Sequence, residues 1–303
     1  MSLAAEPAVA APAITDAQIL QAARSLGAAA GSTLPDLMVT LLSDDAGPDE
    51  VACGVAREPM IAARLLKVAN SPYYGLSRAV STLEQAVQLL GLDAVKGIAA
   101  AACFDRLVTR DSAAAAELQR LREHSLATGC AAQALARRVQ PEQAADLFLA
   151  GLLHDLGIAV QIKLVPDGLA RWRAAGISGR LRDEPLLRES AELLNFGVTH
   201  EHCAGVVFGA WKLPDRLAQV VAHHHDAAIT AAPADTAAGL SARLLALAHG
   251  IALGAGYALE LEPGAAADDA AEASALGIDD EFIGELTARL PQQVWQLTQG
   301  LVR

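Results

Sequence analysis

The residues with the clearest chemical potential stand side by side, where His154 and Asp155 interrupt the apolar stretch 147–157. A helix through this stretch is hydrophobic on every side and is therefore predicted to be buried. Burying an imidazole and a carboxylate costs free energy unless each has a partner. A metal ion would partner both, because Asp offers an anionic oxygen and His a neutral nitrogen. For these two residues alone, a hydrogen-bonded His–Asp pair within a helical core is the simpler interpretation.

The histidines of the chain are unevenly distributed. None occurs in the first 123 residues, where an even scatter would place about three. The full set is His124, His154, His200, His202, His223, His224, His225 and His249. The clusters fall on different predicted helices, and such helices can converge on one centre, as in helix-bundle metal sites. Imidazole and carboxylate without a nearby thiolate suit iron, manganese, zinc or nickel.

The sequence allows more than one role for several of these histidines. Neighbours on a helix project about 100° apart, so His154 and Asp155 are not expected to point the same way, although both can border a site for two metals. His224 and His225 have the same spacing. For His202 and His223, solvent exposure is the simpler interpretation. His249 follows the apolar residues 244–248, where a satisfied core histidine and a metal ligand explain it equally well.

Composition limits the classes of partner. The length of 303 residues allows two domains or one large one. The net charge of −12 argues against a sequence-independent grip on nucleic acid or on an anionic membrane, which needs a basic face. The arginines at 120, 122, 137 and 138 are most simply a solvated helix face, with contact to an anionic ligand as the alternative.

Several features indicate a soluble cytoplasmic protein. The four cysteines at 53, 103, 130 and 203 form no CxxC pair, as is typical of free thiols in the cytosol. Residues 1–13 contain Glu6 and no basic residue, so they do not form a secretory signal and are expected to be a disordered arm. No uninterrupted apolar run reaches the roughly 20 residues that a membrane span needs.

No stretch alternates apolar and polar residues as a strand would, and the chain is predicted to be all-α. Thr15 and Gln18 form a capping box that begins the first helix. A long helix at about 113–139 carries His124, and the next, from 141 to about 163, carries His154 and Asp155. The remaining histidines fall on or beside helices near 200–212, 214–225 and 240–255. An Ala/Asp linker at 264–274 and two short helices, 280–290 and 292–301, complete the pattern.

Several short segments occur in the order of a known family. In the first half they are Leu34-Pro35, Glu58-Pro59-Met60, 65–71 and 86–91. In the second half they are Glu123-His124-Ser125, 151–157, Glu192 followed by His200, 211–214 and His224-His225. Over roughly residues 30–255 the chain resembles the HDOD domain, a bacterial signalling module related to the HD phosphohydrolases.

The resemblance implies a domain order. We expect an N-terminal helical subdomain at 14–110 packed on an HD-type helical core at 111–260. The arm at 1–13 precedes them, and the linker and C-terminal helices occupy 261–303.

The resemblance also implies a ligand set. Many HDOD members lose the metal-binding His and Asp, but the HD doublet is intact here. By similarity to catalytic HD and HD-GYP phosphodiesterases, the metal-ligand positions hold His124, His154, Asp155, His200, His224 and His225. The final Asp of the HD domain is replaced, with His249 near its place, and residues 225–229 lack the Gly-Tyr-Pro segment of cyclic-di-GMP hydrolases.

These implications lead to three functional hypotheses. The first is a non-catalytic signalling output or adaptor module that binds a protein partner, with one or two divalent ions of iron, manganese, zinc or nickel in the HD-like site. The second is a metal-dependent phosphohydrolase or phosphodiesterase acting on a nucleotide or cyclic nucleotide, in which two metals lower the pKa of a bridging water. The third is a hydrogen-bonded histidine core that binds nothing. The oligomeric state stays open, a homo-oligomer included.

Overall fold

The computed structural model describes residues 13–25, 34–43, 45–71, 74–75, 79–108, 114–178, 187–222, 224–225, 237–261 and 269–299. Across these ranges every regular element is helical, and they contain no strand. The all-α prediction is therefore confirmed. The predicted arm, except for residue 13, lies outside the described residues, as do His223 and the first part of the predicted linker.

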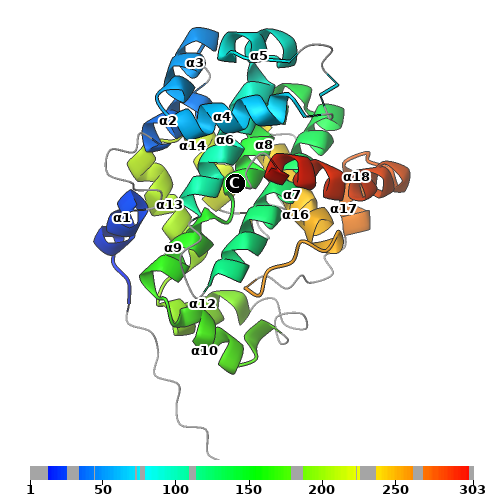
Figure 1. Ribbon diagram of the computed structural model, residues 1–303. Helices are drawn as coiled ribbons and strands as arrows, with labels where there is room; N and C mark the ends of the chain where they lie inside the picture. Colours follow the sequence, from blue (N-terminus) through cyan, green and yellow to red (C-terminus); the bar gives the residue numbers. More distant parts are fainter. Residues whose placement is uncertain are drawn as a thin grey trace, which may run out of the picture.

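The N-terminal helices gather at one end of the molecule (Figure 1). They are α1 (Asp16–Ser25), α2 (Leu34–Leu42), α3 (Pro48–Ala56), α4 (Pro59–Ala69), α5 (Leu83–Leu90) and α6 (Leu92–Leu107), with α1 placed apart from the others beside α13. The capping box forms as predicted, since the Thr15 N–H donates to Gln18 Oε1 at 2.9 Å. Pro48 and Pro59 begin their helices at a position where the missing N–H costs nothing.

Helix α7 (Ala115–Val139) runs through the middle of the molecule and connects its two ends (Figure 1). The elements that follow are η1 (Pro141–Gln143), α8 (Ala144–Leu153), α9 (Leu156–Leu164), α10 (Gly168–Ala174), α12 (Arg188–Phe196), α13 (His200–Trp211), α14 (Asp215–Ala222) and α16 (Ala237–Gly254). Helices α7 and α8 cross at Gly129 and Gly151, where a Cβ on Gly151 would lie 2.7 Å from the Gly129 Cα. These glycines let the two backbones pack almost in contact.

The predicted helix over 141–163 is interrupted at the His–Asp doublet. Helix α8 ends at Leu153, His154 and Asp155 form a turn, and α9 begins at Leu156. The Nδ1 atom of His154 lies 2.7 Å from the Gly151 carbonyl oxygen, so the side chain satisfies a carbonyl that the helix end leaves open. In this turn His154 Nε2 lies 3.1 Å from Asp155 Oδ2. The expectation that the two side chains diverge is wrong, because it assumes a continuous helix.

The C-terminal region also differs from the prediction. Helix α18 (Asp280–Gln299) is continuous and contains Pro291, although the sequence predicts two separate helices. Buried Leu290 and Val294 on either side hold both halves against the core, so the proline does not end the helix. Helix α17 (Asp269–Ala275) forms where the sequence predicts the second half of the linker, because its alanines favour helix and Ala273 is buried.

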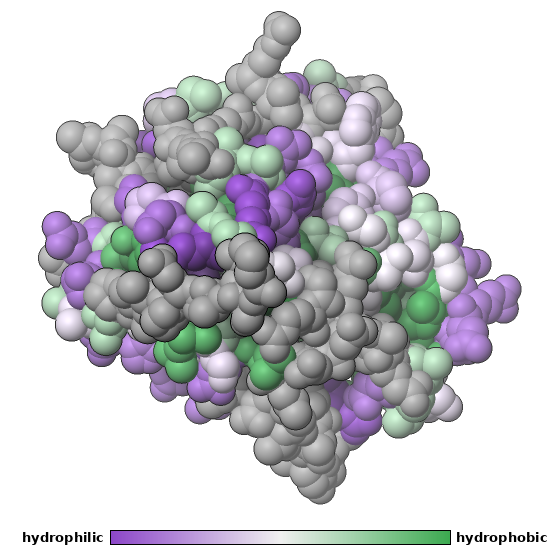
Figure 2. Space-filling view, turned by 90° about the horizontal axis from the view of Figure 1, so that it is seen from below, coloured by the Kyte–Doolittle hydropathy of each residue, from purple (hydrophilic) through white to green (hydrophobic). Residues whose placement is uncertain are grey.

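Among the described residues, the stretch 141–164 is long and apolar enough to cross a membrane, by length and composition only. The prediction from the sequence missed it because it considered only uninterrupted apolar runs. Within the fold 89% of its most apolar window is buried, as in the core segment of a soluble protein. The face at the α10 and α12 end shows hydrophilic residues interspersed with smaller apolar areas (Figure 2). The four cysteines are free thiols, as predicted.

A buried ion-pair group joins α4, α6 and α7. Asp105 accepts from Arg64 Nη1 at 2.7 Å and from Arg122 Nη1 at 2.6 Å, one guanidinium to each carboxylate oxygen. Arg122 is therefore a core residue, and its predicted place on a solvated face is wrong. Arg137 and Arg138 are exposed, as predicted.

Candidate metal centre

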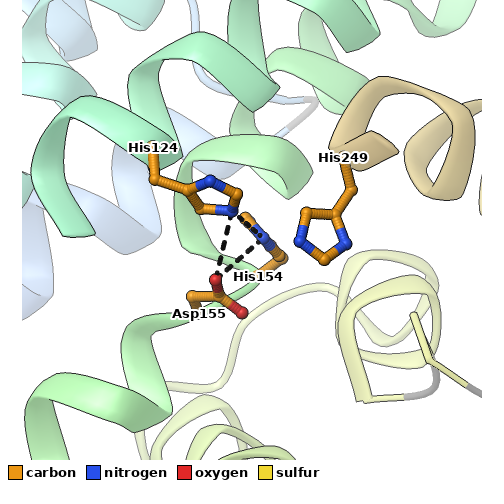
Figure 3. A group of neighbouring side chains, drawn as sticks. All are labelled: His124, His154, Asp155 and His249. Carbon is orange, nitrogen blue, oxygen red and sulfur yellow. Dashed lines mark hydrogen bonds and ion pairs between the residues drawn. The ribbon is translucent and has the colours of Figure 1, made fainter. Parts of the chain in front are cut away.

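The seven candidate ligands come from five parts of the chain and meet at one place. His124 lies in the middle of α7, His154 and Asp155 in the α8–α9 turn, and His200 at the first position of α13. His224 and His225 follow α14, and His249 projects from α16. All are buried except His225, which is intermediate. Figure 3 shows four of them pointing toward one another.

The ligand atoms form two groups that share Asp155. His124, His154, Asp155 and His249 make the first group, and Asp155, His200, His224 and His225 make the second. Within each group the ligand atoms all lie within 4.8 Å of one another.

Each oxygen of Asp155 faces a different group. Oδ2 lies 3.1 Å from His154 Nε2 and 3.3 Å from His124 Nε2. Oδ1 lies 3.3 Å from His224 Nε2 and 3.8 Å from His200 Nε2. The carboxylate therefore lies between two sets of imidazoles.

The outer ring nitrogens of three histidines face carbonyl oxygens. The Nδ1 atoms of His124, His154 and His224 each lie 2.7 Å from a backbone oxygen, those of Tyr257, Gly151 and Val221 respectively. A carbonyl can only accept, so each Nδ1 carries the proton. In a neutral imidazole Nε2 then presents its lone pair, and here it presents it to the centre of the cluster.

His200 is oriented by a carboxylate instead of a carbonyl. Its Nδ1 lies 2.6 Å from Glu192 Oε1, and its backbone N–H donates to Glu192 Oε2 at 2.8 Å. Gln161 Nε2 donates to the same Oε2 at 3.1 Å. Glu192 is fully buried. Its place before His200 belongs to the family resemblance, but the sequence does not predict its role, because only the folded chain brings its carboxylate to the His200 Nδ1.

The donor set fits divalent metal ions. The Nε2 atoms of His124 and His154 are 3.1 Å apart, and two lone pairs at that distance repel unless a cation lies between them. Ligands that share a metal at about 2.0–2.2 Å are themselves roughly 3–3.5 Å apart. Both Asp155 oxygens and His224 Nε2 are buried, and no described residue donates a hydrogen bond to them. Histidines with their outer nitrogen tied to a carbonyl or carboxylate are the usual surroundings of a metal.

Burial and neighbouring charges determine the protonation states. Burial lowers the pKa of His154 to about 4, against the opposing charge of Asp155. Burial would raise the pKa of Asp155, but His154, His124 and His224 outweigh it and hold that pKa well below its usual value. At neutral pH the doublet is thus a neutral imidazole beside a carboxylate, which is the form that binds metals.

The remaining histidine of the described chain lies outside the cluster. The side chain of His202 is 53% exposed, and its Nε2 lies 2.8 Å from Asp16 Oδ1. Its predicted exposure is confirmed. The structure thus brings together the seven predicted ligands and leaves His202 out; that the seven bind metal stays a prediction.

The fold and the buried cluster define an all-α protein of the HD type with a buried group of histidines and an aspartate suited to hold a metal ion. The HDOD domain family matches residues 31–227, which is more than half of the chain, and the chain belongs to that family.

Comparisons with individual proteins support the fold. A protein of Shewanella amazonensis SB2B, provisionally called a phosphohydrolase, is similar with a TM-score of 0.68 and 20% identity, over 94% of this chain and 98% of that one. A provisionally named signal transduction protein of Marinobacter aquaeolei VT8 has a TM-score of 0.67 and 19% identity, over 94% of this chain and 64% of that one. An uncharacterized protein of Treponema pallidum (strain Nichols) is 20% identical over 196 residues, so the match covers 64% of this chain but only 37% of that relative's length.

Proposed function

We propose that this chain is a metal-containing HDOD signalling module that acts in the bacterial cytoplasm through a protein partner, without catalysis of its own. Membership of the HDOD family and the likeness to a signal transduction protein support the signalling role. The observation that supports the metal is the set of inward-facing Nε2 lone pairs around Asp155, with every assigned proton on the outer nitrogen.

Each residue has a distinct task in this proposal. His124, His154 and His249 would hold one ion with Asp155 Oδ2, and His200, His224 and His225 would hold the second with Oδ1. The ions would supply positive charge beside the Asp155 carboxylate and the inward-facing Nε2 atoms. Iron, manganese, zinc and nickel are the candidates for this nitrogen-rich set.

Elemental analysis tests this proposal. Protein purified without chelator is expected to contain about two transition-metal ions per chain, and His154→Ala is expected to lose them. His202→Ala is the control, because that side chain lies outside the cluster and its loss should leave the metal content unchanged. Metal-free wild-type protein after growth with all four metals would contradict the proposal.

A second candidate is a metal-dependent phosphohydrolase or phosphodiesterase for a nucleotide or cyclic nucleotide. The position of Asp155 between two groups of three histidines favours it, since two metals that share a carboxylate lower the pKa of bound water and polarise phosphoryl oxygens. The name of the Shewanella relative points the same way. Hydrolysis of cyclic dinucleotides or nucleotides by metal-loaded protein, lost in Asp155→Ala, would establish it. Inactivity with a filled site would leave the signalling role.

A further inference from the structure

A second potential site lies away from the histidine cluster. A cavity of about 110 Å³ lies between α4, α6, α7, α8 and α18, and none of its lining residues is a candidate metal ligand. It is smaller than the roughly 300–1,000 Å³ typical of pockets for drug-sized ligands, so it suits a small molecule. Helix α18, which packs on α7 and α4, forms one wall of it.

The inner part of the cavity combines an apolar surface with one unmet polar atom. Phe148 of α8 lines it and is buried, and Gly97 of α6 leaves room beside the ring, since a Cβ there would lie 3.4 Å from it. Gln296 of α18 is only 8% exposed, and its Oε1 accepts no hydrogen bond from the described residues. A buried acceptor of this kind requires a donor that the described residues do not supply.

Opposite charges line the same cavity. Asp93 lies in the first turn of α6 and Arg137 in the last turn of α7. Both side chains are exposed, and neither forms an ion pair with a described residue. A bound molecule would therefore meet a guanidinium, a carboxylate and an amide oxygen that lacks a donor.

We infer that this cavity binds a free α-amino acid. The ligand's carboxylate pairs with Arg137, its ammonium group pairs with Asp93, and an N–H donates to Gln296 Oε1. An α-amino acid carries both charges on one carbon, which matches two opposite charges on one small cavity. The bound molecule would tie α18 to α6 and α7 and so give the module an input that is independent of the metal.

The test uses the full-length protein and the common L-amino acids, one at a time, in thermal unfolding and calorimetric titration. At least one is expected to raise the melting temperature and to bind with a Kd of about 1 mM or lower. Arg137→Gln is expected to weaken that binding about tenfold or more, because it removes the partner of the carboxylate. Ala94→Phe is expected to abolish it, because the ring fills the cavity and leaves the polar groups in place.

The matched control is Arg138→Gln. It removes the same charge from the neighbouring position, where the guanidinium pairs with Asp279 at 2.6 Å outside the cavity, and it should bind like the wild type. If Ala94→Phe fails to fold, as judged by its helical circular dichroism, the comparison of Arg137→Gln with Arg138→Gln decides. The inference is overturned if no amino acid binds. It is also overturned if binding is unchanged in Arg137→Gln, because the amino acid would then bind without the guanidinium of this cavity.

Discussion

At the scale of the residue, the orientation of His200 depends on a buried carboxylate that is not itself a candidate for the central ligand set. Glu192 accepts from both the ring and the backbone of His200 at 2.6 and 2.8 Å. It fixes which ring nitrogen carries the proton and makes the other nitrogen a stronger donor to a metal. Its negative charge also offsets part of the positive charge that two divalent ions would bring.

Glu192→Gln should therefore weaken metal binding about 10–100-fold, the usual effect of losing such a partner. Competition with a chromophoric chelator measures this affinity. Glu201→Gln is the control, since that carboxylate lies farther from the same nitrogen, at 3.4 Å, and is partly exposed. Equal affinity in Glu192→Gln and wild type would show that the bond does not support a metal ligand.

The low pKa of His154 makes the metal-free protein sensitive to acid. The pKa is about 4 in the folded chain and near 6.5 in the unfolded chain, so the unfolded state binds more protons between these values. The free energy of unfolding should be constant above pH 6.5 and fall by about 3 kcal/mol as the pH approaches 4. Urea titrations in the presence of chelator measure it, with His154→Gln expected to show a flatter profile. A wild-type profile that is level from pH 7.5 to 4.5 would refute this assignment.

At the scale of the element, the approach of α9 to α13 sets the position of the doublet. A Cβ on Gly157 would lie 1.8 Å from the His200 carbonyl oxygen. Neither atom could rotate away, because the position of each is fixed by the backbone. The glycine therefore allows the first turn of α9 to lie against the start of α13, which brings Asp155 and His200 into one cluster.

Gly157→Ala should destabilise the protein by about 3 kcal/mol or more, because the two helices must separate. Gly205→Ala provides the control. That glycine lies within α13, where an added Cβ would have nothing within 4 Å of it, and alanine there should be neutral or stabilise by about 0.5–1 kcal/mol. Chemical denaturation measures both. Equal stability of the two variants would mean that the helices do not meet as closely as described.

At the scale of the whole molecule, the Arg64–Asp105–Arg122 group couples the N-terminal helices to α7. All three side chains are largely buried, and each carboxylate oxygen has its own guanidinium. Removing one member of a buried group leaves charge without a partner.

Asp105→Ala should lower the free energy of unfolding by about 3–5 kcal/mol. Glu285→Ala removes one side of an exposed pair, with side chains 56% and 69% exposed, and should cost well under 1 kcal/mol. Equilibrium unfolding in guanidinium chloride compares the two. A small effect of Asp105→Ala would show that the N-terminal helices dock by apolar contacts alone.

The division of the chain at residues 110 and 260 stays a prediction.

Much of this protein follows from local sequence signals. The helix start at Thr15 depends on residues within one turn of each other, so the chain alone predicts it. The apolar residues around His154 and Asp155 predict that this stretch is buried, and it is. The confinement of the histidines to residues 124–249 indicated which part of the chain carries the cluster.

Tertiary structure decided how these residues face one another. The turn at His154 and Asp155 breaks an apolar pattern that is typical of one continuous helix, and the close packing at Gly157 accompanies it. The carbonyl of Tyr257 fixes the ring of His124 from 133 residues away. Such contacts form between residues far apart in the sequence and depend on how the whole chain packs. Periodicity and local propensity carry no information about them. Sequence thus determined the ligand types and the helices, while only the fold turned the lone pairs of those ligands toward a shared centre.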